Sequence, residues 1–237
     1  MESPPHSFSP TRWTLVVQAS GHDDTGRTAL RDLCAAYYEP VVAFLRREGR
    51  TEDDARDLAH GFFERLLAGG SLRGANPERG RFRSYLLGAV KHFVRDERAR
   101  DHAAKRGGGQ STIPLQDTAS GMGEPDPTST QAEIAFDRQW AFTVIGRALD
   151  TVAADFRVAG KESQFAVLKP WITGNAPRSQ SEAAADLGLT EGAVRVAIHR
   201  LREQFRNAVT TEIAQTTFQP DEAADELRHL IAVVSAD

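Results

Sequence analysis

The stretch from Ser179 to Arg206 constrains the fold of this chain more than any other, because it encodes two helices around a tight turn. Ser179, with Glu182 three residues later, forms a capping-box pattern in which each residue satisfies a free amide at the start of a helix. Gly188 can end that helix in a left-handed conformation, and Thr190 can cap the next one. The sequence therefore predicts a short helix, a tight turn and a second helix.

The second of these helices carries two chemically different faces. Apolar residues recur at helical spacing on one face, and basic residues recur at i, i+4, i+7 and i+11 on another. A short helix followed by a basic one is typical of the helix-turn-helix, whose second helix enters the major groove of DNA. An amphipathic hairpin with a solvated charged face explains the same residues. The apolar residues are Val194, Ala197, Ile198, Leu201 and Phe205, and the basic ones are Arg195, His199, Arg202 and Arg206.

Charge is segregated along the chain. The net charge of −4 over 237 residues argues by itself against a nucleic-acid binder. Residues 73–106, however, contain ten Lys and Arg against four acids, whereas residues 107–137 contain five acids and no Lys or Arg. Charge blocks of opposite sign indicate that these segments have different roles.

Cysteine content and hydropathy bound the cellular environment. Cys34 is the only cysteine, so an intramolecular disulfide is excluded and a reducing cytoplasm is favoured. Its place in an apolar stripe predicts a small core residue rather than a nucleophile. No segment approaches the roughly 18 apolar residues of a membrane span, and none resembles a secretory leader. We therefore expect a cytoplasmic protein without membrane contact.

An acidic helix is expected to begin after Thr51. Thr51 can cap it, and the acids that follow lie where the helix dipole favours negative charge. Apolar residues mark one face, and Asp54, Asp57, Gly61 and Glu64 mark the other. Capping and solvation explain these acids, and docking of a protein partner is the functional alternative. No His or carboxylate partners recur at ligand spacing, so we expect no metal and no cofactor.

The helix expected at Phe82–Arg100 combines aromatic and basic residues. Apolar positions recur at helical spacing from Phe82, and Arg83, Lys91, Arg95 and Arg98 mark a different face. Cations that follow a phosphate backbone, with rings that stack on bases, are typical of proteins that bind single-stranded nucleic acid. A solvated basic helix explains the same pattern.

Helical periodicity extends through most of the chain, without alternating strand patterns or internal repeats. The predicted fold is all-α: two helical domains joined by a flexible linker, the C-terminal one with a helix-turn-helix. We expect the second domain to contain a long helix at 133–159 and a short one at 164–172. The expected order is an N-terminal arm (1–27), a helical domain (28–105), an acidic linker (106–132), the helix-turn-helix domain (133–212) and a C-terminal acidic helical extension (213–237).

Three motifs in this order resemble the extracytoplasmic-function (ECF) group of bacterial RNA polymerase sigma factors. Residues 51–66 (TEDDARDLAHGFFERL) are similar to the helix with which that family docks on the polymerase β′ clamp. Residues 82–100 (FRSYLLGAVKHFVRDERAR) are similar to the element that opens and reads the −10 promoter element. Residues 189–202 (LTEGAVRVAIHRLR) are similar to the −35 reader. The resemblance covers residues 28–105 and 133–212.

The resemblance implies a sigma factor without catalytic residues, which binds core RNA polymerase and directs transcription initiation at promoter DNA. An anti-sigma factor or other regulator is a further candidate partner. Polymerase binding is implied for Asp54, Asp57, Leu58, His60, Gly61 and Glu64. Contacts with the −10 element are implied for Asn76, Arg79, Arg83, Ser84, Tyr85, Lys91, His92, Arg95 and Arg98. Contacts with the −35 element are implied for Glu191, Gly192, Arg195, Val196, His199, Arg200, Arg202 and Arg206.

Two other functions explain part of the sequence. A helix-turn-helix regulator that binds duplex DNA without polymerase would explain residues 179–206 but leaves the block at 51–100 without a role. An enzyme acting on a phosphorylated ligand could use the Arg- and Gly-rich segment 69–83. No nucleophile, metal or base constellation accompanies that segment, however.

Overall fold

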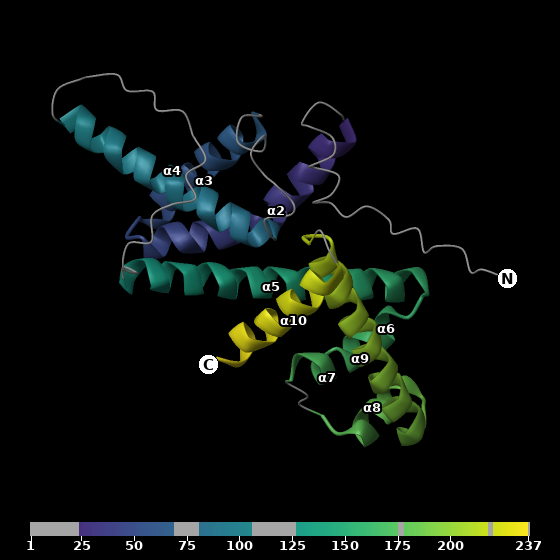
Figure 1. Cartoon of the computed structure of the whole chain (residues 1–237). Coiled ribbons are helices and arrows are strands. Elements are labelled where there is room, and N and C mark those ends of the chain that lie inside the picture. The colour runs from purple at the N-terminus through teal and green to yellow at the C-terminus, as the bar shows by residue number, and fades with distance from the viewer. Residues whose placement is uncertain (1–23, 69–80, 106–126, 175–177, 218–219, 237) are drawn as a thin grey trace. The chain divides into compact units, whose positions relative to one another are not determined.

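The computed structural model describes residues 24–68, 81–105, 127–174, 178–217 and 220–236, in which every regular element is an α-helix (Figure 1). The all-α prediction is confirmed for these residues. No helix among them is long and apolar enough to cross a membrane. The helices are α2 (Asp24–Arg47), α3 (Glu52–Leu67), α4 (Phe82–Lys105), α5 (Pro127–Val158), α6 (Glu162–Leu168), α7 (Pro170–Thr173), α8 (Gln180–Leu187), α9 (Glu191–Ala214) and α10 (Pro220–Ser235).

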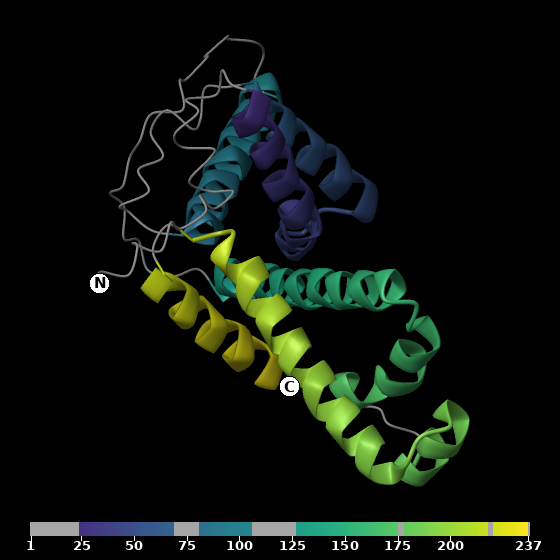
Figure 2. The same ribbon diagram turned by 90° about the vertical axis from the view of Figure 1, so that its right-hand side faces the viewer.

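The described helices belong to two compact units. Unit 1 contains the described residues up to Ala141 and those from Ala214 onward, and unit 2 contains Phe142–Ile213. Unit 1 therefore includes α2, α3, α4, the first part of α5 and α10. Unit 2 includes the rest of α5, α6, α7, α8 and nearly all of α9 (Figure 2).

These units differ from the predicted domains. The sequence predicts residues 133–141 in the second domain and 213–237 as an extension outside both, yet the structure places 133–141 and the described residues from Ala214 onward in unit 1. Phe136 and Trp140 of α5 are 0% and 1% exposed there, and Glu226 of α10 is 0% exposed. Periodicity could not place these segments, because their partners lie far away in the sequence. The predicted linker also ends earlier than expected, since α5 begins at Pro127, a residue suited to the first helical turn.

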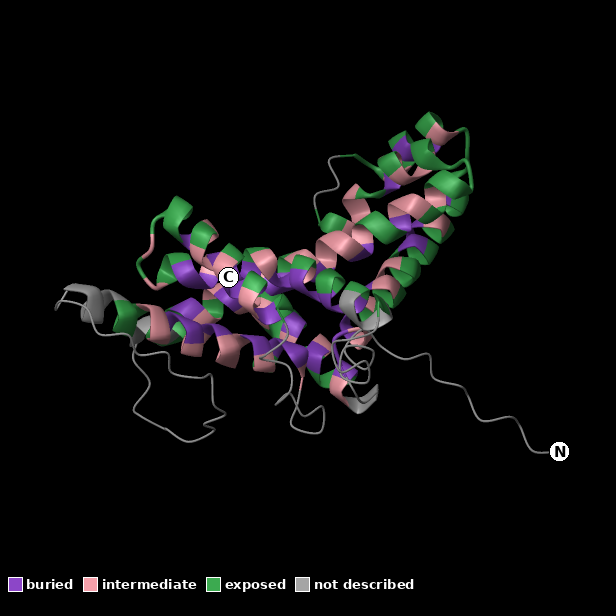
Figure 3. Ribbon diagram, turned by 90° about the horizontal axis from the view of Figure 1, so that it is seen from above, coloured by how far each residue is buried: buried purple, intermediate pink, exposed green. Residues whose placement is uncertain are grey.

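Aromatic side chains from four helices form the core of unit 1. Tyr37 of α2 lies edge-on to Phe82 of α4, with ring centroids 5.1 Å apart, and stacks on Phe136 of α5 at 6.2 Å. Phe62 of α3 meets Phe93 of α4 at 5.5 Å. Such pairs add about 0.5–1.5 kcal/mol each beyond the burial of their area. The apolar faces predicted for the helices at 51–66 and 82–100 therefore pack into one common core, whose buried residues Figure 3 colours purple on the ribbon.

Cys34 lies within this core. Its side chain is buried in α2, and burial raises the pKa of the thiol to about 12, since a thiolate would lose its hydration there. The prediction of a small core residue is confirmed, and Cys34 is a thiol at neutral pH.

The core of unit 2 forms where α6 and α8 pack against α9. Leu168 of α6 and Leu201 of α9 are both 0% exposed, and Val194 and Ile198 extend the same buried face. Ala183 and Ala184 of α8 join this cluster, and α8 lies close to α6. The face predicted from apolar spacing is the one that packs, which leaves the opposite side of α9 exposed.

The predicted caps of α8 and α9 are present. The Ser179 amide donates to Glu182 Oε2 at 2.7 Å, and the Glu182 amide donates to Ser179 Oγ at 3.2 Å, which completes the capping box. Gly188 ends α8 with φ of 63°, a conformation that opposes a Cβ. The Ala193 amide donates to Thr190 Oγ1 at 3.2 Å at the start of α9.

The helix predicted at 164–172 is wrong in one respect, because the structure divides it. α6 ends at Leu168 and α7 begins at Pro170. Proline has no amide hydrogen and its ring clashes with the carbonyl four residues earlier, so it begins a new helix instead of continuing the old one. Gly174 then ends α7 with φ of 80°.

Replacement of the α8 cap tests how this local geometry stabilises unit 2. Ser179→Ala should reduce the stability of unit 2 by about 1 kcal/mol, measured by urea unfolding, because the Glu182 amide loses its acceptor, the Ser179 hydroxyl. The capping hydrogen bonds lower the pKa of Glu182. The contribution of Glu182 is therefore present at neutral pH and lost as the pH falls through its folded-state pKa.

Ser181→Ala is the matched control, because Ser181 is exposed inside α8 and outside the capping pair. Equal stabilities for the two variants would contradict the structural role of the cap.

Candidate functional site

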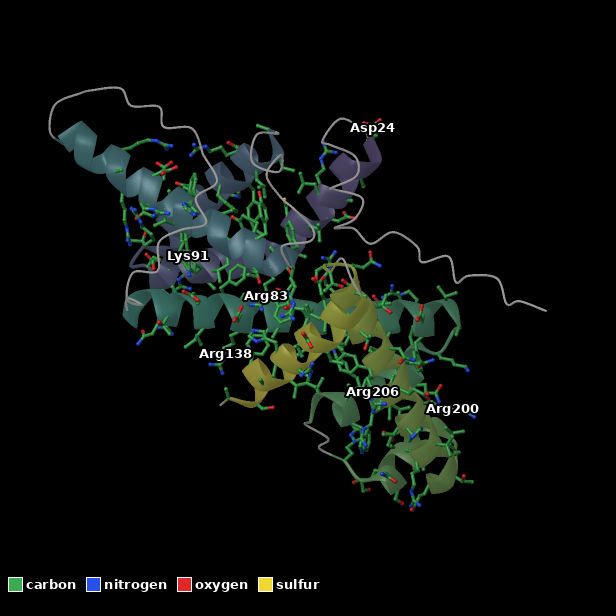
Figure 4. All side chains as sticks on the ribbon, in the orientation of Figure 1. Asp24, Arg83, Lys91, Arg138, Arg200 and Arg206 are labelled. Atoms are coloured by element: carbon green, nitrogen blue, oxygen red, sulfur yellow. The ribbon has the colours of Figure 1, made fainter. Side chains whose placement is uncertain are left out.

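The exposed side of α9 carries a basic stripe formed by Arg195, His199 and Arg206. All three side chains are exposed, and no ion pair within the described part of the chain engages them. At 3.6 residues per turn these three residues fall within a sector of about 40° on the helix, and Arg202 extends it to about 60°. The stripe lies about a quarter turn from the buried face of α9, and its exposed side chains can offer hydrogen-bond donors to an extended anionic partner; Arg206 is labelled in Figure 4.

Arg202 belongs to the same sector but has a structural partner. Its Nε and one terminal nitrogen donate to the backbone carbonyl of Trp171, at 3.3 and 3.1 Å. This forked contact ties α9 to the end of α7. The predicted phosphate contact of Arg202 would therefore use a guanidinium that already holds the fold.

A cavity of about 600 Å³ opens beside α9 within unit 2, and the sequence did not predict it. It is lined by the last turns of α5, by α6 and by α9, with Phe156, Leu168, Leu189 and Val196 among the apolar residues. Gly192, Val196 and Arg200, all predicted −35 contacts, line this cavity. The residues predicted to contact the −35 element are therefore divided between two places, the basic stripe and the edge of the cavity. Glu191, at the start of α9, lies beside the stripe.

The acidic face predicted for α3 is exposed. Asp54, Asp57, His60 and Glu64 are all exposed, whereas Leu58 and Gly61 are half-buried. Thr51 caps α3 by accepting from the Asp54 amide at 3.2 Å. The structure therefore brings the predicted polymerase-binding residues together on one helix surface.

His60 has a defined orientation on this surface. Its Nε2 lies 2.9 Å from the hydroxyl of Tyr38 on α2, and the ring centroids are 5.2 Å apart. The neighbouring helix therefore positions the imidazole before any partner binds.

Arg83 is the clearest correction to the predicted site. The sequence predicts that it contacts DNA phosphates, but the residue is 8% exposed and its donors are used inside the protein. One terminal nitrogen donates to Asp137 Oδ1 at 2.5 Å, while Nε and the other donate to the two Glu226 oxygens at 3.0 and 3.2 Å. The guanidinium also lies over the Trp140 ring, 5.2 Å from its centroid.

The neighbouring Arg81, which the sequence analysis does not select, belongs to the same cluster. It donates to Glu226 at 2.8 Å and to Asp225 at 3.0 Å. His229 of α10 lies 3.0 Å from the second oxygen of Asp137. In the sequence, only the acidic character of α10 pointed toward this cluster. Arg83 and Glu226 are 143 residues apart, so no local pattern links them.

Burial and the charges of this cluster together shift the pKa values of Arg83 and Tyr37. Burial opposes the charge of Arg83, but its bonds to Glu226 and the nearby Asp137 raise its pKa above the ordinary value. Burial, and then the negative charge of Glu226, raise the pKa of Tyr37. Arg83 is therefore a permanent cation and Tyr37 a neutral phenol at any physiological pH.

The other predicted −10 residues differ in exposure. Lys91 pairs with Glu133 of α5, and Arg98 donates to the Glu48 side chain at 2.7 Å. Arg95 is exposed and contacts His92, 2.5 Å from its Nδ1. Ser84 is exposed, and Tyr85 is half-buried. Asn76 and Arg79 lie outside the described residues.

Comparisons with protein-family models, with curated proteins and with solved structures give no match. Within the described ranges, no group of three or more His, Cys, Asp or Glu side chains is arranged to hold a metal ion. The candidate functional surfaces are therefore the acidic face of α3 and the partly engaged basic residues of α4 in unit 1 and, separately, the stripe on α9 in unit 2.

Removal of Glu226 tests the buried cluster. Glu226→Ala should reduce the stability of unit 1 by about 3–5 kcal/mol in thermal or urea unfolding, because it leaves Arg83 buried with one partner fewer. Asp225→Ala is the control on the adjacent residue. Its pair with Arg81 is half-exposed, so it should cost at most about 1 kcal/mol. Similar losses for both variants would contradict the structural role of Glu226.

Proposed function

We propose that the chain is a sigma factor of the ECF type, which binds core RNA polymerase through unit 1 and promoter DNA through unit 2. The observation that carries this proposal is the separation of charge. An exposed acidic face lies on α3 in unit 1, and an exposed basic stripe lies on α9 in unit 2. The resemblance of residues 51–66, 82–100 and 189–202 to sigma-factor motifs supports the same function.

In this proposal α3 docks on a basic surface of polymerase, the β′ clamp. Asp54, Asp57 and Glu64 supply the charge, and half-buried Leu58 supplies an apolar contact. Complementary charge accelerates encounter and selects the partner, and the apolar contact slows release. His60, oriented by Tyr38, lies on the same face.

In the same proposal α8 and α9 act as a helix-turn-helix, and the stripe on α9 enters the major groove at the −35 element. Arg195 is the base reader, since a bidentate pair with guanine discriminates by about 1–3 kcal/mol. Arg206 contacts phosphate, which positions the helix without specifying sequence. The −35 and −10 contacts can each be weak, because polymerase holds both units near one promoter.

The −10 contacts of the proposal are more limited than the sequence predicts. Ser84, Arg95 and Arg98 are exposed on α4, and Tyr85 and His92 are half-buried. Arg83 is excluded while α10 is docked, since its donors are occupied. This partial engagement favours a second candidate, a duplex-binding regulator that acts without polymerase. Transcription by core polymerase with this protein, with start sites mapped genome-wide, separates the two.

Charge reversal on α3 tests the polymerase contact. Asp57→Lys should abolish co-purification with core polymerase, because it places a cation against the basic surface expected of the partner. The variant should unfold like the wild type, since Asp57 is exposed. Asp150→Lys makes the same charge change on an exposed position of α5 and should leave binding intact. Retained co-purification of the Asp57 variant would refute the assignment of α3.

Alanine variants of the stripe test the division between base and phosphate contacts. Arg195→Ala should lose affinity at one base pair of the −35 element, by about 1–3 kcal/mol, in competition binding with point-substituted promoters. Arg206→Ala should weaken binding to all these promoters equally and reduce the salt dependence by about one unit of slope. A uniform loss for Arg195→Ala would exclude it as a base reader.

A further inference from the structure

The C-terminal helix α10 places two adjacent carboxylates against two arginines at the start of α4. Arg81 donates to Glu226 at 2.8 Å and to Asp225 at 3.0 Å, and both of these acids lie on α10. Arg83 donates to the same Glu226 but also to Asp137 of α5. Arg81 therefore depends on α10 for every ion pair that it makes here, whereas Arg83 keeps one partner when α10 is absent.

The attachment of α10 relies on these charges. Of its described residues, Ala223, Glu226 and Leu230 are buried, and Leu227 and Val233 are half-buried, so two buried apolar side chains and two half-buried ones form its apolar contact. That surface is small for a helix from Pro220 to Ser235, whose ordering costs conformational entropy in every residue. Its outward side includes Ile231 and Val234, at 54% and 41% exposed. The ion pairs therefore add to a limited apolar contact in holding the helix on its unit.

The arrangement beneath α10 suits a phosphate. Guanidinium groups bind carboxylates and phosphates through the same forked hydrogen bonds, so the two carboxylates occupy the positions that phosphate oxygens would take. Arg81 is one-quarter exposed even with α10 in place, so one side of this site is already accessible. The same α4 continues to exposed Ser84 and Arg95.

We propose that Arg81 and Arg83 form a phosphate-binding site for single-stranded nucleic acid, and that α10 occupies this site intramolecularly until the strand displaces it. The inference deepens the proposed −10 role of α4 and rests on it. Asp225 and Glu226 act as internal competitors, so the strand and docked α10 exclude each other. Each must then weaken the binding of the other by the same factor.

Hydrogen–deuterium exchange of the full-length wild-type chain tests this competition directly. The probe is a mixed-sequence single-stranded DNA oligonucleotide at saturating concentration and low salt. Amides of α10 should exchange faster in the complex, because the strand displaces the helix. Amides of α3 provide the internal control and should not change. Unchanged protection of α10 in the saturated complex overturns the proposal.

Variants then test the role of the ion pairs. Asp225→Asn should bind the oligonucleotide about two- to fivefold more tightly, the range expected for loss of a half-exposed pair. Asp53→Asn, which removes one exposed carboxylate from α3, controls for the change in net charge. In the Arg81→Gln background the gain from Asp225→Asn should disappear, since the two residues act through one contact. Glu226 is left intact because its burial links it to folding.

The outcomes divide clearly. Three results would overturn the phosphate site. The first is a gain in oligonucleotide affinity for Asp225→Asn no larger than that for Asp53→Asn, and the second is a gain that survives in the Arg81→Gln background. The third is the absence of oligonucleotide binding by any variant. If the protein directs promoter-specific transcription but α10 stays protected from exchange in the saturated complex, only this inference is refuted. If the oligonucleotide displaces α10 but the protein does not initiate transcription with core polymerase, only the sigma-factor assignment is refuted.

Discussion

The carboxylate of Glu226, buried between Arg81 and Arg83, is the interaction on which the organisation of unit 1 depends. A buried acid is costly without partners, and so is a buried guanidinium. Each therefore requires the other, and the requirement draws α10 back onto α4 across 143 residues of sequence. Asp137 adds a third element, because it binds the other side of Arg83 and brings the start of α5 into the same unit. The boundary of unit 1 follows from these charges together with the aromatic core around Tyr37.

Unit 2 is organised by a different constraint, the packing of α8 and α6 against one face of α9. The small residues of α8 and the buried leucines of α6 and α9 pack together, and this packing fixes which side of α9 faces inward. The basic stripe is exposed as a consequence. The exposed residues of α9 do not form one uniform surface. Val196 and Arg200 line the cavity beside the helix, whereas Arg195 and Arg206 belong to the basic stripe.

Charge distribution explains how a chain with a net charge of −4 can be proposed to bind nucleic acid. The acids and bases are separated by helix and by unit, so the local field differs from the average. The structure also reduces the positive surface that the sequence suggests. Arg81, Arg83, Lys91 and Arg98 are paired with acids of the same chain, which leaves Arg95 as an exposed cation of α4 outside those pairs. A count of basic residues in the sequence therefore overstates what α4 offers to a phosphate backbone.

The sequence by itself determined the features that depend on near neighbours. Helical spacing identified the buried faces of α2, α3, α4 and α9, and the Ser179, Gly188 and Thr190 caps follow from hydrogen bonds that span three or four residues. The exposed acids of α3 and the stripe on α9 were predictable for the same reason. Only the tertiary structure decided the fate of Arg83, the membership of α10 in unit 1 and the cavity beside α9. Each of these features depends on side chains that come into contact only after the chain has folded back on itself. A local sequence pattern does not indicate which distant acid will pair with a buried arginine.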